Sequence, residues 1–273
     1  MKKKTFQNIL KHMVSLFLSL LVLLPFYMVF VNSFKGKSES ARMSLSLPKE
    51  WLFSNYAEVI KKADLFHGLL NSLIYALVAT VAGVTLCAMA SFVLSRNRTR
   101  LNRFLYYFVI CGLFFPVNYV TLVKVFQTMH LTNTRLGIVL VFTSAMIPFC
   151  VFTIYSFIES VPKEMDEAAV IDGASPLKLF FKVILPMPKP TIVTCFILQF
   201  MGVWNDFLTP LYLSSKSKLF PMTMSVYQFF GKNKSYWNYI FADIILTIIP
   251  VIIVYFIGQK YLVEGTNSGA VKG

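Results

Sequence analysis

The chain has 273 residues, of which 56% are hydrophobic and only 14% are charged. Soluble domains average about 25% charged residues, so this composition excludes a protein that faces water on all sides. The net charge of +14 does not indicate a nucleic-acid partner, because the basic residues lie in short segments between apolar stretches. Membrane lipid and protein partners are the expected counter-charges there. The four cysteines lie inside apolar stretches at no metal-ligand spacing, so we expect neither disulfides nor a metal site.

Six apolar stretches of 20 to 26 residues are long enough to cross roughly 30 Å of membrane hydrocarbon as helices. They cover 13–34, 69–94, 104–123, 136–158, 191–213 and 239–258. We therefore predict an all-α, polytopic membrane protein with six transmembrane helices. Its parts are an N-terminus (1–12), a transmembrane domain (13–260) and a C-terminal tail (261–273). The lysine-rich start is similar to a secretory signal, but the long apolar run that follows it favours a retained first helix.

Basic residues indicate which ends of the helices face the cytoplasm. Six crossings place both termini on one side, and the basic residues divide almost evenly between the two sides. Local density is more informative, because the positive-inside rule weighs short segments next to the membrane. Four arginines lie within 96–103 and four lysines within 1–11. We therefore expect both termini in the cytoplasm.

The second stretch carries a small residue at every fourth position along one face. These residues are Ala79, Gly83, Cys87 and Ser91. Such a stripe lets helix backbones approach closely in lipid, and ordinary packing inside the bundle is its expected role. Five stretches also contain an internal proline, which removes a backbone hydrogen bond and favours a bend. The prolines are Pro25, Pro116, Pro148, Pro210 and Pro250.

Two carboxylates lie inside apolar stretches, where an ionised group costs at least about 2.5 kcal/mol. Asp206 follows Trp204 and Asn205 in the sequence. Pro210 also leaves the carbonyl of Asp206 without its helical partner. An aromatic face, an amide, a carboxylate and a free carbonyl suit a sugar, so we predict that Trp204, Asn205 and Asp206 border a substrate path. A structural hydrogen bond to a neighbouring helix is the alternative for Asp206, and also for Asp243.

The connection 159–190 is too long for a simple turn and carries helix signals. A proline and three acids, at positions 162, 164, 166 and 167, suit the first turn of a helix. Gly173 suits the left-handed position that ends it. Ser175 and Pro176 then indicate the start of a second helix, with an apolar face formed by residues 177, 180, 181 and 184. We predict two short helices at a sharp angle on the membrane surface, where a passive amphipathic element is the other interpretation.

This connection resembles the EAA loop of ABC importer permeases. Glu167-Ala168-Ala169, Gly173 and Leu185-Pro186 stand at the spacing of that motif, with Val183 where the family usually has isoleucine. The resemblance extends over most of the chain and is closest to the carbohydrate-uptake permeases of the maltose-transporter type. The further matching segments are Asp172-Gly173-Ala174-Ser175, Asn71-Ser72-Leu73, Trp204-Asn205-Asp206-Phe207-Leu208, Pro210-Leu211 and the ending 265–273.

The resemblance implies that this chain works as one subunit of a complex of several chains. A second, similar permease completes the translocation path, a cytoplasmic ABC ATPase dimer docks on the loops, and an extracytoplasmic solute-binding protein delivers a sugar. The chain then lies in the cytoplasmic membrane of a prokaryote, with the loop and both termini in the cytoplasm. The implied ATPase-coupling residues are Glu167, Ala168, Ala169, Asp172, Gly173, Leu185 and Pro186.

The resemblance also implies that this chain is no enzyme and binds no cofactor, because partner subunits hydrolyse the ATP. The sequence agrees, since Gly36-Lys37-Ser38 has Val31 where a phosphate-binding loop needs glycine. An ion-coupled secondary transporter, with Asp206 and Asp243 as ion sites, is the alternative, but it leaves the EAA loop unexplained. An integral membrane enzyme is disfavoured, because the three histidines lie in separate segments.

Overall fold

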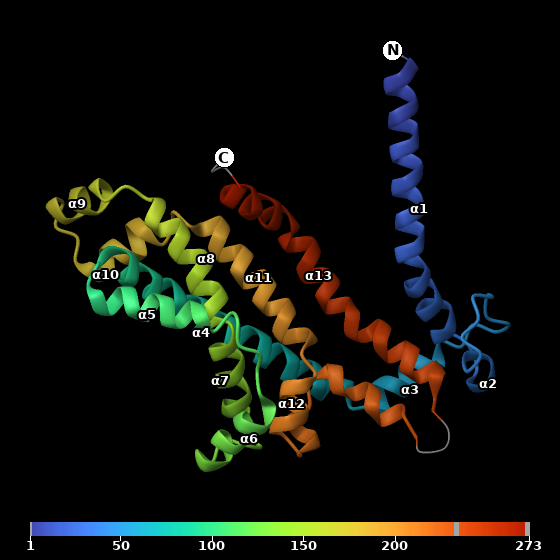
Figure 1. The fold of residues 1–273 in the computed structure, drawn as a ribbon. Coiled ribbons are helices and arrows are strands. Elements are labelled where there is room, and N and C mark those ends of the chain that lie inside the picture. Colours follow the sequence, from blue (N-terminus) through green and yellow to red (C-terminus); the bar gives the residue numbers. More distant parts are fainter. Residues whose placement is uncertain (1, 232–234, 271–273) are drawn as a thin grey trace. The chain divides into compact units, whose positions relative to one another are not determined.

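A computed structural model describes residues 2–231 and 235–270 of the chain, with side chains for 8–231 and 235–261 (Figure 1). The described part is helical and contains no strand. The chain forms two compact units. Unit 1 comprises Met1–Phe66 and Met224–Pro250, and unit 2 comprises His67–Thr223 and Val251–Gly273.

The helices follow in chain order. Unit 1 holds α1 (Lys2–Ser33), α2 (Lys37–Ser40), α3 (Ser54–Lys62), most of the 3-10 helix η3 (Met222–Phe229) and the start of α13 (Trp237–Ala270). Unit 2 holds nearly all of α4 (Leu65–Arg96), then α5 (Arg100–Cys111), α6 (Tyr119–Thr128), α7 (Arg135–Ala145), α8 (Ile147–Ser160), α9 (Glu164–Ile171), α10 (Pro176–Lys178), the π-helix η1 (Leu179–Ile184), α11 (Lys189–Asn205), α12 (Leu208–Leu213), the 3-10 helix η2 (Ser217–Leu219) and the end of α13.

Three helices are, by length and composition, apolar enough to cross a membrane, and two bent helix pairs raise the number to five within the described residues. The single helices are Asn8–Ser33, Leu65–Arg96 and Trp237–Tyr261. The pairs are α7 with α8, bent by 43°, and Pro176–Ile184 with Lys189–Asn205, bent by 85°. The prediction of a helical chain with helices apolar enough to cross a membrane is confirmed for the described residues, whereas the number of six crossings stays a prediction.

The third stretch, 104–123, is not the single helix that we predicted. It is divided between α5 and α6. The break contains Pro116, and the Asn118 side chain caps the first turn of α6 by accepting a hydrogen bond from the Thr121 N–H at 3.1 Å. A residue that cannot continue a helix, followed at once by a capping side chain, ends one helix and starts another.

Two further stretches break close to a proline. The stretch 136–158 bends between α7 and α8, just before Pro148, and the stretch 191–213 breaks at Asp206, between α11 and α12. Pro25 and Pro250 instead lie inside continuous helices. The predicted tail 261–273 forms the end of α13 as far as Ala270, and residues 271–273 lie outside the described part.

Unit 1 contains a lysine that the sequence analysis did not single out. Lys35 is fully buried, and its Nζ donates to Asn32 Oδ1 at 3.1 Å, to the Ser44 carbonyl at 2.8 Å and to the Ser44 hydroxyl at 3.0 Å. The Asn55 amide donates to the Ser33 carbonyl at 2.8 Å and to the Lys35 carbonyl at 3.0 Å. Burial lowers the pKa of Lys35. The complete set of acceptors offsets the cost of removing an ammonium group from water.

Asp243 is also buried in unit 1, on α13. The Ser225 hydroxyl lies 2.8 Å from Asp243 Oδ1 and 3.0 Å from Oδ2, and donates to this carboxylate. The bond joins α13 to η3. This is the structural role that the sequence analysis gave as the alternative to ion coupling.

In unit 2 the small-residue stripe of α4 packs against α7 and α8. Its four members, all buried, are Ala79, Gly83, Cys87 and Ser91. The Ser91 hydroxyl donates to the Val151 carbonyl at 3.4 Å, and a Cβ on Gly83 would overlap the thioether of Met146. The stripe therefore has the packing role that we predicted.

Two polar residues near the start of α4, Asn71 and Ser72, bind the segment that leads into η3. The Asn71 amide donates to the carbonyls of Lys218 at 2.9 Å and Phe220 at 3.1 Å. The Ser72 hydroxyl accepts a hydrogen bond from the Met222 N–H at 2.8 Å. Asn71 and Ser72 therefore have a structural role within this chain, which is to hold a segment distant in sequence.

Candidate functional site

The connection 159–190 forms the two short helical segments that we predicted, and the first of them, α9, ends at a glycine. Gly173 has a φ of +77°, in the left-handed region. Its N–H donates to the Val170 carbonyl at 3.0 Å, and the Ala174 N–H donates to the Ala169 carbonyl at 3.0 Å. This pair of bonds is the Schellman motif. A Cβ on Gly173 would meet no atom within 4 Å, so the backbone conformation alone favours glycine here.

The second segment begins as predicted but exposes a different face. The Ser175 hydroxyl accepts a hydrogen bond from the Lys178 N–H at 3.4 Å and so caps α10. The chain then continues as the π-helix η1, whose wider turn shifts the side chains away from the α-helical periodicity. Phe180 and Ile184 are buried as predicted, together with Leu179, whereas Leu177 and Phe181, also predicted on the apolar face, are exposed.

An arginine at the end of α4 anchors α9. Arg96 Nε lies 2.6 Å from Asp166 Oδ2, and Arg96 Nη2 donates to Asp166 Oδ1 at 3.2 Å. Arg96 Nη1 also donates to the carbonyls of Ile158 at 3.3 Å and Val161 at 3.2 Å, at the end of α8. The side chains of Arg96 and Asp166 are only 12% and 15% exposed, so water screens this ion pair poorly. A single side chain thus joins α4, α8 and α9.

A second ion pair lies next to the first but is more exposed. The Arg98 guanidinium contacts the Glu159 carboxylate, with 62% and 32% of these side chains exposed. Exposed pairs contribute about 0–1 kcal/mol, because water competes for both partners. We therefore assign the main anchoring role to Arg96.

The base of the loop packs on α4. The rings of Phe180 and Phe92 lie 5.5 Å apart between centroids. Leu185 and Pro186 line a shallow hollow together with Ala88 of α4. Leu185 and Pro186 thus lie where the loop meets the helix bundle.

The remaining predicted coupling residues lie on or beside α9, at one end of unit 2 (Figure 1). Glu167, Ala168, Asp172 and Gly173 are exposed, and Ala169 is half-buried. Within the part of the chain that the structure describes, Glu167 forms no ion pair. This surface also carries two exposed apolar residues that the sequence analysis missed, Val170 and Ile171, the latter 85% exposed. Exposed apolar side chains rimmed by polar residues are typical of a surface that a partner covers.

Asp206 lies at the break between α11 and α12. Its Oδ1 accepts a hydrogen bond from the Thr209 N–H at 2.8 Å, and its Oδ2 accepts one from the Thr209 hydroxyl at 3.0 Å. The Thr223 hydroxyl donates to the Asp206 carbonyl, which Pro210 leaves without a helical partner, at 3.4 Å. The carboxylate therefore closes the first turn of α12, which is a structural role within this chain.

The other two predicted path residues differ in exposure. Trp204 is only 1% exposed, and its ring stacks on that of Phe200 with centroids 5.9 Å apart. The ring of Trp204 is thus used in packing within this chain, and its place beside a substrate path stays a prediction. The Asn205 side chain is exposed.

The ion pair that anchors the loop, Arg96 with Asp166, could not be predicted from the sequence. In the sequence, Arg96 reads as one of several basic residues near the membrane, and Asp166 as an acid suited to the start of a helix. The pair is separated by 70 positions. No local spacing connects the two residues, so only the fold reveals their contact.

Residues 80–267 match the protein family described as "Binding-protein-dependent transport system inner membrane component". The match covers more than half of the chain, and the chain belongs to this family. The resemblance to ABC importer permeases is confirmed. The chain is therefore an inner membrane component of a transport system and not itself an enzyme.

Two relatives and one solved structure extend this comparison. The chain is 33% identical over 268 residues to the diacetylchitobiose uptake system permease protein of Streptomyces coelicolor, covering 96% of this chain and 88% of the relative. It is 32% identical over 274 residues to the probable starch degradation products transport system permease protein of Thermoanaerobacterium thermosulfurigenes, covering 100% of both. The fold is similar to that of a bacterial ABC transporter involved in the import of the acidic polysaccharide alginate, with a TM-score of 0.85, 22% identity, and 96% and 98% of the two chains covered.

Proposed function

We propose that the chain is the permease subunit of an ATP-driven importer for a sugar or oligosaccharide. The observation that carries the proposal is the exposed surface of α9. The Arg96–Asp166 ion pair holds α9 to α4 and α8, and this surface stays free for a partner. The names of the two relatives concern carbohydrates, which supports this substrate class. The connection 159–190 is then the joint that receives force from a cytoplasmic ABC ATPase dimer, since ATP hydrolysis belongs to these partners.

In this proposal the chain crosses the cytoplasmic membrane six times, with both termini and the loop in the cytoplasm. The bent pair α7–α8 forms one crossing, and α5 leads into the third. Two observations support the orientation. The arginine-rich segment 96–103 has the density expected of a cytoplasmic segment. The ion pair of Arg96 with Asp166 also supports one side for that segment and the loop.

The solute path is proposed to run along the break between α11 and α12, completed by a second, similar permease. Asn205 is exposed there and can offer its amide to a hydroxyl group. Asp206 and Trp204 support Asn205 by holding the break in shape. An extracytoplasmic solute-binding protein delivers the sugar.

The test is uptake into vesicles. The chain is reconstituted with its second permease, the ATPase pair and the binding protein, and labelled sugar is offered outside while ATP is enclosed on the ATPase side. The proposal expects uptake that needs ATP and continues after the ion gradients are collapsed. An ion-coupled secondary transporter would instead take up sugar without ATP and stop when the gradients collapse.

A further inference from the structure

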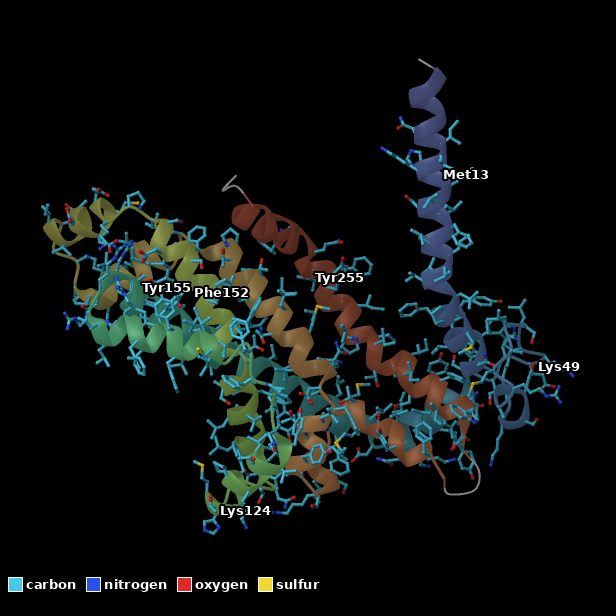
Figure 2. All side chains as sticks on the ribbon, viewed as in Figure 1. Met13, Lys49, Lys124, Phe152, Tyr155 and Tyr255 are labelled. Carbon is cyan, nitrogen blue, oxygen red and sulfur yellow. The ribbon has the colours of Figure 1, made fainter. Side chains whose placement is uncertain are left out.

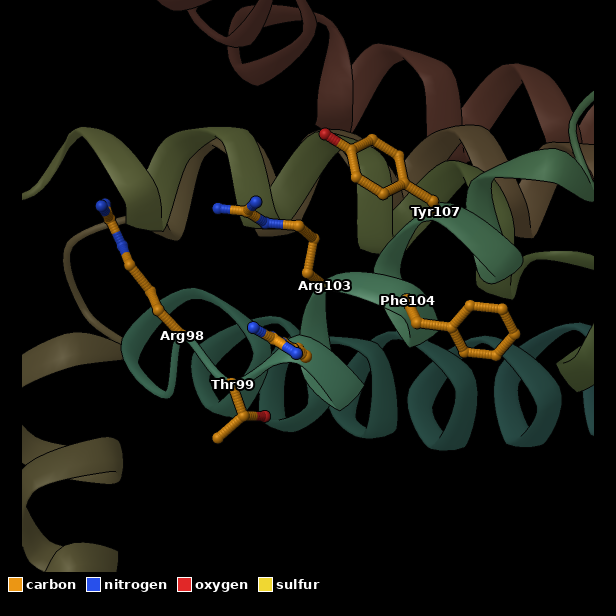
Figure 3. A pocket seen from close by; sticks show the side chains of 6 residues that line it. Arg98, Thr99, Arg103, Phe104 and Tyr107 are labelled. Carbon is orange, nitrogen blue, oxygen red and sulfur yellow. The ribbon is translucent and has the colours of Figure 1, made fainter.

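A basic pocket lies at the start of α5. Its lining residues, which we call the α5 pocket, are Arg98, Thr99, Arg100, Arg103, Phe104 and Tyr107 (Figure 3). Arg98 contacts the Glu159 carboxylate. Across the described ranges, neither Arg100 nor Arg103 forms an ion pair. The α5 pocket therefore contains three guanidinium groups, of which, among the described residues, only that of Arg98 is paired with a carboxylate, and its net charge is positive.

The geometry of the α5 pocket suits an anion. Figure 3 shows the side chains of Arg98, Arg103 and Tyr107 extending toward the same side. Thr99 caps α5 by accepting a hydrogen bond from the Asn102 N–H at 3.1 Å. The positive end of this 12-residue helix adds to the field of the arginines. Guanidinium groups bind phosphate through paired hydrogen bonds, so a phosphate group fits this set of donors.

Along α5 the exposed residues change from cationic to aromatic. Arg100 and Arg103 are followed at helical spacing by Phe104, Tyr107 and Phe108, which are 63%, 60% and 66% exposed. Aromatic rings are common where membrane helices meet the headgroup region, next to the acyl chains. A free phosphate ion or an acidic protein segment would use the arginines but not the rings. A phospholipid uses both.

We propose that the α5 pocket binds an anionic phospholipid, with the headgroup phosphate at Arg100 and Arg103 and an acyl chain along Phe104 and Phe108. Its location in the inner leaflet rests on the proposed function, because the Arg98–Glu159 contact places the α5 pocket on the same side as the loop 159–190. Anionic lipids of that leaflet attract basic segments. The bound lipid therefore lies at the base of the coupling loop.

The test measures lipid selectivity directly. The complete importer complex is equilibrated in nanodiscs that contain equal amounts of phosphatidylglycerol and phosphatidylcholine, without ATP, and the lipids retained are counted by native mass spectrometry. Each arginine next to an anionic surface strengthens binding about fivefold. The double variant Arg100→Gln, Arg103→Gln is therefore expected to reduce the preference for phosphatidylglycerol about 25-fold. The double variant Arg100→Lys, Arg103→Lys keeps the charge and is expected to retain most of the preference. Comparing it with the glutamine variant shows whether the loss comes from the missing charge or from a folding defect.

The matched control removes two exposed charges elsewhere in unit 2. Lys124→Gln with Lys216→Gln is expected to leave the lipid preference unchanged (Lys124 is labelled in Figure 2). An unchanged preference in the arginine variant overturns the proposal. Full displacement of the lipid by excess inorganic phosphate, or a cross-link from the α5 pocket to an ATPase chain, also contradicts it. Failure of the proposed function appears separately, as absent ATP-dependent uptake in complexes that still select the lipid.

Discussion

Two of the interruptions between helices in unit 2 use acidic side chains in opposite ways. In the connection 159–190, Asp166 is bound by an arginine 70 positions away, whereas Asp206, at the break between α11 and α12, is bound by Thr209 in the next turn. The first contact fixes an exposed surface relative to α4 and α8, while the second shapes only its own helix start. A carboxylate in an apolar chain therefore does not by itself mark a ligand site. The group that binds the carboxylate determines its role.

The largest effect is expected when the long-range anchor is removed. Arg96→Gln leaves Asp166 without its cation in a poorly hydrated place and frees two carbonyls of α8, and losing one partner of a buried pair costs about 3–5 kcal/mol. We expect ATP-dependent uptake to fall by at least about a hundredfold, since each 1.4 kcal/mol corresponds to a factor of ten.

Arg98→Gln is the matched control for that variant, because its ion pair is 62% and 32% exposed. Uptake should change by no more than about twofold, in line with exposed pairs of about 0–1 kcal/mol. Equal losses in the Arg96 and Arg98 variants would mean that burial does not distinguish the two pairs.

A smaller loss is expected at the end of α9. Gly173→Val meets no neighbouring atom, so its cost is the left-handed backbone penalty of about 1–2 kcal/mol. That penalty disfavours the angle between the two short helices, and we expect sugar-stimulated ATP hydrolysis and uptake to fall about 5- to 30-fold.

Two variants control the Gly173 experiment. Gly173→Asn tolerates the left-handed conformation and should retain most of the uptake. Gly202→Val introduces the same side chain on α11, where a Cβ also meets nothing within 4 Å, and should have little effect. If Gly173→Asn were as damaging as Gly173→Val, the backbone explanation would fail.

The smallest effect is expected at the local contact. Asp206→Ala removes the group that closes the first turn of α12, which costs about 0.5–2 kcal/mol. The complex should unfold at a lower temperature, and its uptake should fall in proportion to the folded fraction. Asp206→Asn keeps an acceptor for the Thr209 N–H and should resemble the unaltered protein in both measurements. A folded Asp206→Asn complex that has lost uptake would show that the charge itself acts in the path.

The loop could be predicted because its signals are local. Gly173, Ser175 and the acids of the first turn each report on the backbone within a few residues, and the structure confirms the helix end and the cap. The buried face of the second segment was predicted only in part: Phe180 and Ile184 are buried as expected, but Phe181 is exposed in η1, a π-helix whose periodicity differs from 3.6 residues. In 104–123 the sequence indicated a bend at Pro116, but the start of a new helix at the capping residue Asn118 was missed.

The predicted substrate path shows a different limit. Trp204, Asn205 and Asp206 are adjacent in sequence, but the structure buries the first, exposes the second and uses the third as a local cap. Sequence spacing indicates which groups are near one another. It does not indicate whether a side chain is already occupied by its own fold, as Trp204 is by Phe200.

The most direct test of docking is a cysteine cross-link from the tip of α9. Among the native cysteines only Cys111 is exposed, so Cys111→Ser gives a background in which an added thiol dominates labelling. Ile171→Cys, at a site 85% exposed, is compared with Val120→Cys, at a site 81% exposed on α6. Docking of the loop predicts that a short bifunctional reagent joins the thiol at position 171, and not the one at 120, to the ATPase chain. A cross-link at neither position, or an equal yield at both, would contradict the role of 159–190 as the joint with the ATPase.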